Sequence, residues 1–206
     1  MEPIIAIPSA KSLKRQEKEE KNNKMLFGFW IYIMTDCVLF ASLFATYAVL
    51  HNNVYNGPGG AQIFKLPYVL GETLLLLTSS FSCGLATISL QNRSKRKVIS
   101  YFILTFILGL GFIVMELNEF HNLVLAHESW RRSGFLSAYF TLVGTHGLHV
   151  IVGLIWMAVM ITRVSISGLT NNIVRRLKML AIFWHFLDVI WIFIFTIVYL
   201  LGALHL

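Results

Sequence analysis

Charged side chains are scarce in this 206-residue chain, where Asp, Glu, Lys and Arg together make up 13% of the residues and apolar side chains 56%. The mean hydropathy is +0.69. A water-soluble globule of this size needs more polar side chains to cover its surface, so the composition argues against a soluble fold. The chain also lacks an internal repeat of fixed period, so nothing supports a transporter built from repeats.

Cysteine is also rare. The chain has two, Cys37 and Cys83, and both lie inside apolar runs, where a thiol behaves as a small hydrophobic group. The cysteines therefore indicate little about the redox compartment. A cleavable signal peptide is not expected either. The basic cluster follows the short apolar patch Ile4–Ile7, and the next apolar run is too long for a signal sequence. We therefore expect the first apolar run to remain in the mature protein.

Long apolar runs are what the sequence has instead. A helix needs about 20 apolar residues to cross a hydrocarbon layer of about 30 Å. Five runs meet this length, near residues 26–50, 68–90, 98–120, 135–162 and 178–203. We therefore predict an all-α fold, a membrane bundle of five transmembrane helices over residues 25–206. The charged residues 1–24 precede it and are expected to form a surface helix or to be disordered.

The Lys and Arg residues are divided unequally among the connections between the runs. Six precede the first run, four lie between the second and third, and four follow the fourth, whereas Lys65, Arg131 and Arg132 are the three on the other side. Cytoplasmic loops carry the excess of positive charge, so the N-terminus is expected in the cytoplasm and the C-terminus in the periplasm. The net charge of +7 then suits anionic lipid head groups, and a nucleic-acid partner is not expected.

Ionisable side chains inside the apolar runs are the candidate functional residues. A charge at the bilayer centre costs at least about 2.5–3.5 kcal/mol, so each one needs a partner, neutralisation or a function. Helical rise predicts two layers. The mid-membrane layer on the first, fourth and fifth runs holds Asp36, His146, His149, His185 and Asp188. The outer layer on the second and third runs holds Glu72, Glu116 and Glu119.

Two of these pairs have a spacing that places both side chains on one helix face. They are His146 with His149 and His185 with Asp188. Imidazoles and a carboxylate suit a metal such as zinc, copper or iron. Hydrogen bonding between helices is the alternative and the one we favour, because no thiolate or third pair completes a ligand shell. No catalytic, metal-binding or cofactor-binding residue is therefore assigned.

Asp36 is interpreted separately because its neighbours along the chain point to other sides of the helix. Its hydrogen-bond partner is therefore expected on another transmembrane run. A structural or lipid-facing role is favoured over a proton path, since no ladder of ionisable residues crosses both leaflets.

Three stretches resemble subunit III of the haem-copper oxidases: Gly144–Val150 (GTHGLHV), Trp184–Trp191 (WHFLDVIW) and Gly28–Phe40. The resemblance covers residues 25–204, and the pairing of the first two motifs is more specific than a lone histidine pair. It implies a subunit that binds no haem or copper itself. Such a subunit binds phospholipid in a cleft and supports the catalytic subunit, including its proton uptake.

Several candidate residues match positions of that family. Asp36 matches the intramembrane carboxylate of the family, and Glu119 matches a glutamate at the outer end of the third run. The polar positions of the family's last two helices are matched by His146, His149, His185 and Asp188. Five runs rather than seven, with the loop from Gly57 to Pro67 and Glu72-Thr73, resemble the ubiquinol-oxidising bo-type branch of bacterial inner membranes. The resemblance implies partner subunits I, II and IV, with haem and copper in the catalytic subunit. Alternatives are a menaquinol or cytochrome c oxidase and, more remotely, a stand-alone proton-coupled transporter.

Overall fold

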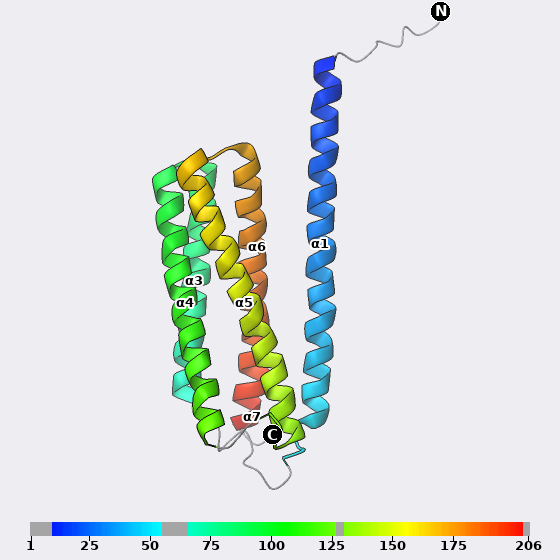
Figure 1. The fold of residues 1–206 in the computed structure, drawn as a ribbon, viewed down its shortest axis with the longest axis vertical. Helices are drawn as coiled ribbons and strands as arrows, with labels where there is room; N and C mark the ends of the chain where they lie inside the picture. Colours follow the sequence, from blue (N-terminus) through cyan, green and yellow to red (C-terminus); the bar gives the residue numbers. More distant parts are fainter. Residues whose placement is uncertain (1–9, 55–65, 127–129, 204–206) are drawn as a thin grey trace, which may run out of the picture. The chain divides into compact units, whose positions relative to one another are not determined.

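A computed structural model describes residues 10–54, 66–126 and 130–203 (Figure 1). Its elements are α1 (Ala10–Leu50), α3 (Leu66–Gln91), α4 (Lys95–Leu125), α5 (Gly134–Ser167), α6 (Asn171–Ile194), the π-helical η1 (Phe195–Leu200) and α7 (Leu201–Ala203). Among these residues, five helical stretches are long and apolar enough to cross a membrane, which confirms the predicted number of spans. The loop from Gly57 to Lys65, part of the resemblance, lies outside the described residues.

The helices extend beyond the apolar runs at several ends. Helix α1 already begins at Ala10, so most of the charged N-terminal segment is helical, and α6 begins at Asn171 rather than near residue 178. The starts of two helices have local causes. The Ser133 hydroxyl accepts a hydrogen bond from the Leu136 amide at the start of α5, and the Thr170 hydroxyl accepts one from Ile173 at the start of α6. These caps satisfy amide groups that the first helical turn leaves without partners.

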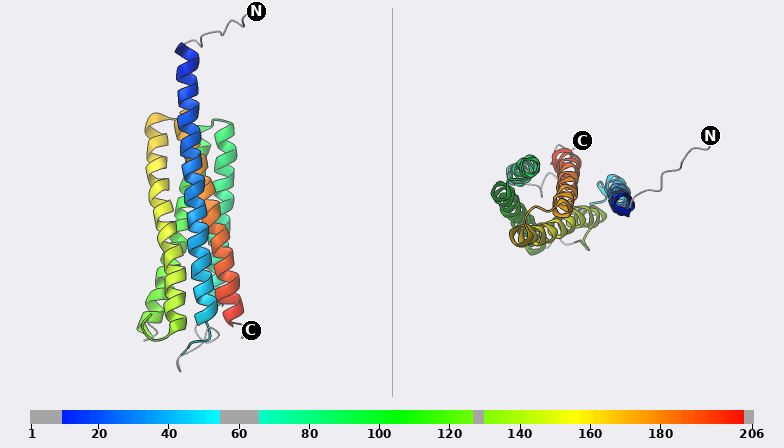
Figure 2. Two further views of the ribbon diagram at one scale, coloured as in Figure 1. Left: turned by 90° about the vertical axis from the view of Figure 1, so that its right-hand side faces the viewer. Right: turned by 90° about the horizontal axis from the view of Figure 1, so that it is seen from above.

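The chain divides into two units, Met1–Leu39 and Phe40–Leu206. In the second unit, α3 packs against α4 and α6, and α5 also packs against α4 and α6. Each of these four helices thus has two neighbours in a closed ring, which can be followed in the end-on view of Figure 2. The core of the second unit is therefore the space enclosed by α3, α4, α5 and α6.

Hydroxyl groups of α3 connect this helix to α6. The indole N–H of Trp191 donates to Thr73 Oγ1 and that of Trp184 to Ser79 Oγ, both at 3.1 Å. Ser79 in turn donates to the Thr105 carbonyl of α4 at 3.2 Å. Lipid tails are as apolar as leucine, so close packing and hydrogen bonds of this kind hold membrane helices together. The two tryptophans of α6 are therefore held in place by packing around the ring and by the hydrogen bond of the indole nitrogen.

Candidate functional site

Seven of the eight candidate residues lie in the second unit, while Asp36 lies on α1 in the first. Asp36 shares a side-chain hydrogen bond with Tyr32, one helical turn earlier on the same helix. The carboxyl group therefore has a hydrogen-bond partner on its own helix, whereas the sequence-based expectation considered only partners on other spans. The spacing of four residues brings two side chains of one helix together, which an argument from the adjacent Thr35 and Cys37 overlooks.

The three glutamates gather inside the second unit, on α3 and α4. Glu72 and Glu116 are 0% and 3% exposed. Glu116 interacts electrostatically with both Glu72 and Glu119. Glu119 accepts a hydrogen bond from the Tyr199 hydroxyl at 3.0 Å, and this hydroxyl is 2.9 Å from that of Tyr139. The predicted grouping of the three glutamates is thus present, and two tyrosines extend it to α5 and η1.

Glu116 reaches across to α5 because α5 carries a glycine opposite it. A Cβ atom built on Gly147 would lie only 2.6 Å from one carboxyl oxygen of Glu116 and 2.8 Å from the other. A pocket of about 130 Å³ lies beside this contact, lined by Glu116 and by apolar residues and glycines of α4 and α5. The carboxyl group therefore separates the protein interior from a small pocket on the α4–α5 pair.

Replacing Gly147 with alanine is expected to displace the Glu116 carboxyl and to lower the free energy of unfolding by about 1 kcal/mol. The carboxyl group can retreat along its flexible side chain, so the cost stays modest. Thermal unfolding of the purified protein measures it. Gly144→Ala is the matched control on the same helix, because its Cβ would lie 3.7 Å from Phe120, an ordinary contact. A larger loss for Gly144→Ala than for Gly147→Ala would contradict this interpretation.

His146 lies among aromatic rings next to these glutamates. It is 0% exposed, and its ring centroid is 5.9 Å from that of Phe112 and 5.3 Å from that of Trp191. Phe112 lies one turn before Glu116, and Trp191 donates to Thr73, the residue after Glu72. His146 therefore lies beside rings whose neighbours along the chain or hydrogen-bond partners adjoin Glu116 and Glu72.

The two residues of the predicted His146–His149 pair both lie against the Phe40 ring but differ in their other contacts. His149 Nδ1 forms a hydrogen bond with the Thr145 carbonyl of its own helix at 2.8 Å, whereas His146 is enclosed by rings. In α6, His185 Nδ1 lies 2.7 Å from Ser80 Oγ of α3, and Ser80 also forms a hydrogen bond with Asp188. Hydrogen bonding between helices, the favoured interpretation, is thus present at His185 and Asp188, with a serine as the partner.

The resemblance places haem and copper in the partner catalytic subunit of the complex. Among the described residues, no three His, Cys, Asp or Glu side chains come close enough together to hold a metal ion. His149 and His185 already use one ring nitrogen in hydrogen bonds within the protein. No redox step is therefore assigned to these residues.

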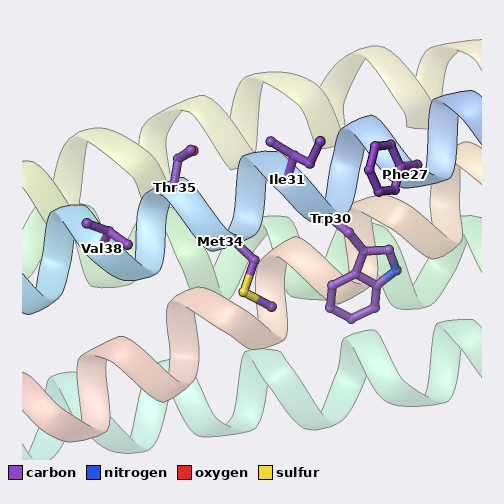
Figure 3. A pocket seen from close by; sticks show the side chains of 6 residues that line it. All are labelled: Phe27, Trp30, Ile31, Met34, Thr35 and Val38. Atoms are coloured by element: carbon purple, nitrogen blue, oxygen red, sulfur yellow. The ribbon is translucent and has the colours of Figure 1, made fainter.

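Helix α1 carries a different kind of feature in the first unit. Six of its side chains line an open pocket of about 470 Å³, as Figure 3 shows: Phe27, Trp30, Ile31, Met34, Thr35 and Val38. Thr35 is the polar residue among them, and its hydroxyl donates to the Tyr32 carbonyl at 2.7 Å. The lining therefore offers an apolar surface that suits hydrocarbon chains.

Sequence reasoning missed the hydroxyl partners of the buried polar groups, namely Thr73, Ser79, Ser80, Tyr139 and Tyr199. Serine and threonine are common in membrane helices, so their presence alone does not single them out. The one usable signal was the series of Thr and Ser residues on α3, which faces two tryptophans and a histidine of α6.

Comparison with known proteins agrees with the resemblance seen in the motifs. The sequence model of the family described as cytochrome c oxidase subunit III matches residues 9–203. Cytochrome bo(3) ubiquinol oxidase subunit 3 of Pseudomonas aeruginosa is 52% identical, over 90% of this chain and 88% of its own length. Quinol oxidase subunit 3 of Bacillus subtilis is 40% identical, over 90% of this chain and 91% of its own. The five-span chain therefore belongs to the cytochrome c oxidase subunit III family.

Proposed function

We propose that this chain is subunit III of a bacterial ubiquinol oxidase, a multi-pass protein of the cytoplasmic membrane. The observation that carries the proposal is the 52% identity, over nine-tenths of the chain, to subunits named cytochrome bo(3) ubiquinol oxidase subunit 3. A second Pseudomonas subunit of the same name, from Pseudomonas putida, is also 52% identical over 87% of this chain. The five apolar helices agree with a protein embedded in the membrane.

In the proposed complex this chain supports the catalytic subunit and carries out no redox chemistry itself. Haem and copper belong to the partner catalytic subunit, and the described residues of this chain include no group of three His, Cys, Asp or Glu side chains that could hold a metal ion. Subunits I, II and IV are the proposed protein partners. Bound phospholipid is proposed as a further component, and the apolar pocket on α1 is a surface that suits its acyl chains (Figure 3).

Two alternatives, a menaquinol oxidase and a cytochrome c oxidase, differ from this proposal in the electron donor of the complex. A cytochrome c oxidase subunit 3 from a Bacillus species is 41% identical, so the family likeness alone does not fix the donor. A stand-alone proton-coupled transporter is less well supported. Such proteins use interrupted helices at their substrate sites, whereas α3, α4 and α5 run without a break through their apolar segments and α6 continues directly into the π-helical η1.

Purification of the native complex through a tag on this chain tests the proposal. The expected product contains haem-bearing partner subunits and reduces dioxygen with ubiquinol faster than with menaquinol or reduced cytochrome c. A partnerless chain without haem would contradict the subunit assignment. Faster turnover with menaquinol or cytochrome c would leave that assignment intact and overturn the choice of donor.

Asp36→Ala is expected to leave the haem content of the complex unchanged while weakening assembly or shortening sustained turnover. The carboxyl group is proposed to act in structure or lipid contact and not as a haem ligand. The absorption spectrum per complex and the decline of oxygen consumption with time measure the two effects. Cys37→Ala, at the next residue of the same helix, is the control expected to behave as wild type. Loss of the haem spectrum from a fully assembled complex would refute the assignment.

The N-terminus is proposed to lie in the cytoplasm. Fourteen of the 17 Lys and Arg residues belong to the connections on that side. Single cysteines placed in the connections of a Cys37→Ala and Cys83→Ala background report the topology through a membrane-impermeant thiol reagent on intact cells. Cysteine at the exposed Asn92 is expected to be protected and cysteine at the exposed Arg131 to be labelled, and the reverse pattern would overturn the orientation.

A further inference from the structure

Glu72, Glu116 and His146 contain six buried polar atoms without a hydrogen-bond partner among the described residues. These atoms are the four carboxyl oxygens and the two ring nitrogens. His146 is an observation independent of the two acids, because its ring comes from another helix and is fully buried. Buried polar groups in folded proteins nearly always have a partner, which is either protein or ordered water. Leucine would fill these positions without any such need.

The three side chains share one neighbourhood through the residues around them. The Glu116 carboxyl lies against Gly147, the residue after His146. The ring of Trp191 lies beside His146 at 5.3 Å between centroids, and its indole N–H donates to Thr73, next to Glu72. Glu72 and Glu116 also interact electrostatically. Trp191 thus lies beside His146 of α5 and bonds to the residue that follows Glu72 on α3, while the Glu116 carboxyl of α4 lies against the residue that follows His146.

We propose that Glu72, Glu116 and His146 form a binding site for internal water molecules within the second unit. The pocket of about 130 Å³ beside Glu116 is lined by Glu116 and not by Glu72 or His146, so the proposed waters lie on the inner side of the Glu116 carboxyl, away from this pocket. Carboxyl oxygens and imidazole nitrogens supply the several polar partners that a buried water requires.

The bound water extends an existing chain of exchangeable hydrogens. Glu119 accepts from the Tyr199 hydroxyl, and this hydroxyl lies within hydrogen-bond distance of Tyr139. Glu119 interacts electrostatically with Glu116 and stands nearer the end of α4. The chain therefore runs from Glu119 to the water held by Glu116, Glu72 and His146. This water site does not depend on which electron donor the complex oxidises.

Radiolytic hydroxyl-radical labelling of the intact purified complex in ¹⁸O-labelled water tests the proposal, with oxidised residues identified by mass spectrometry. Radicals form from bound waters and oxidise the side chains beside them. Trp191 and Trp184 are matched probes, because both are buried in α6 and both donate their indole N–H to a hydroxyl of α3. Trp191 is expected to incorporate ¹⁸O several times faster than Trp184.

In the double variant Glu72→Leu with Glu116→Leu, the rate of ¹⁸O incorporation at Trp191 is expected to fall to that at Trp184. Ser79→Ala removes the acceptor of Trp184 and is the control expected to leave Trp191 unchanged. Equal, slow labelling of the two tryptophans in the wild-type complex would overturn the proposal, and an acyl chain seated against Glu116 would produce this result. Fast labelling of Trp191 in the double variant would also overturn it. The wild-type comparison remains decisive if the double variant does not assemble.

Discussion

Replacing Trp191 with alanine is expected to lower the free energy of unfolding of this subunit by about 3–5 kcal/mol, the cost of removing a large aromatic side chain from a packed core. Trp191 is 0% exposed, and its ring lies 4.6 Å from that of Phe112 and 6.1 Å from that of Tyr199 between centroids. The hydrocarbon surroundings do not reduce this loss, because packing is what holds membrane helices together. Release of the subunit from the purified complex on heating or in denaturant measures it.

Trp191→Phe separates packing from hydrogen bonding at this position. It keeps an aromatic ring and removes the N–H that donates to Thr73, so a smaller loss of about 0.5–1.5 kcal/mol is expected from the hydrogen bond. Trp30→Ala on α1 is the control for a tryptophan that is 45% exposed, and a change within about 0.5 kcal/mol is expected. Equal losses for Trp191→Ala and Trp30→Ala would show that Trp191 carries no special packing role.

The spans could be predicted from the sequence because each depends on a local property, the length of an apolar run. The early start of α1 was harder to predict, because residues before Met25 are charged. Those charges recur at helical spacing, as in the contact of 3.8 Å between Glu20 and Lys24, and such pairs support a helix in water. Hydropathy indicates only which segments are apolar enough to be buried in lipid. It does not detect a charged helix that is stabilised by ion pairs in water.

The partners of the buried polar groups could not be predicted because they come from distant parts of the chain. Tyr139 and Tyr199 are 60 residues apart, and Ser80 and His185 are 105 apart. Depth along a helix does not say which side of it faces a neighbour. His146 illustrates this, since its predicted depth grouped it with His185, whereas its ring lies among the residues that surround Glu72 and Glu116.

Gly109→Ala is expected to lower the free energy of unfolding by about 2–3 kcal/mol, the upper part of the usual range for overpacking a core. An added Cβ would lie 2.8 and 2.9 Å from two ring atoms of Trp184. The ring cannot easily retreat, because its indole nitrogen is fixed to Ser79 and its other edge lies 3.2 Å from the Cβ position of Gly153. Thermal release of the subunit from the complex measures the effect.

Gly111→Ala is the matched control, because it lies on the same helix and its Cβ would lie 3.8 Å from Leu75. Alanine is also the better helix former, so little loss or a small gain is expected there. Trp184→Phe removes the ring atoms that the added Cβ would strike, so Gly109→Ala should cost less in that background than in the wild type. Residues in contact couple in this way, whereas distant ones add. If Gly109→Ala cost the same in the wild type and in the Trp184→Phe background, the added methyl group would not be clashing with the Trp184 ring. The close approach of α4 to α6 would then not depend on this glycine.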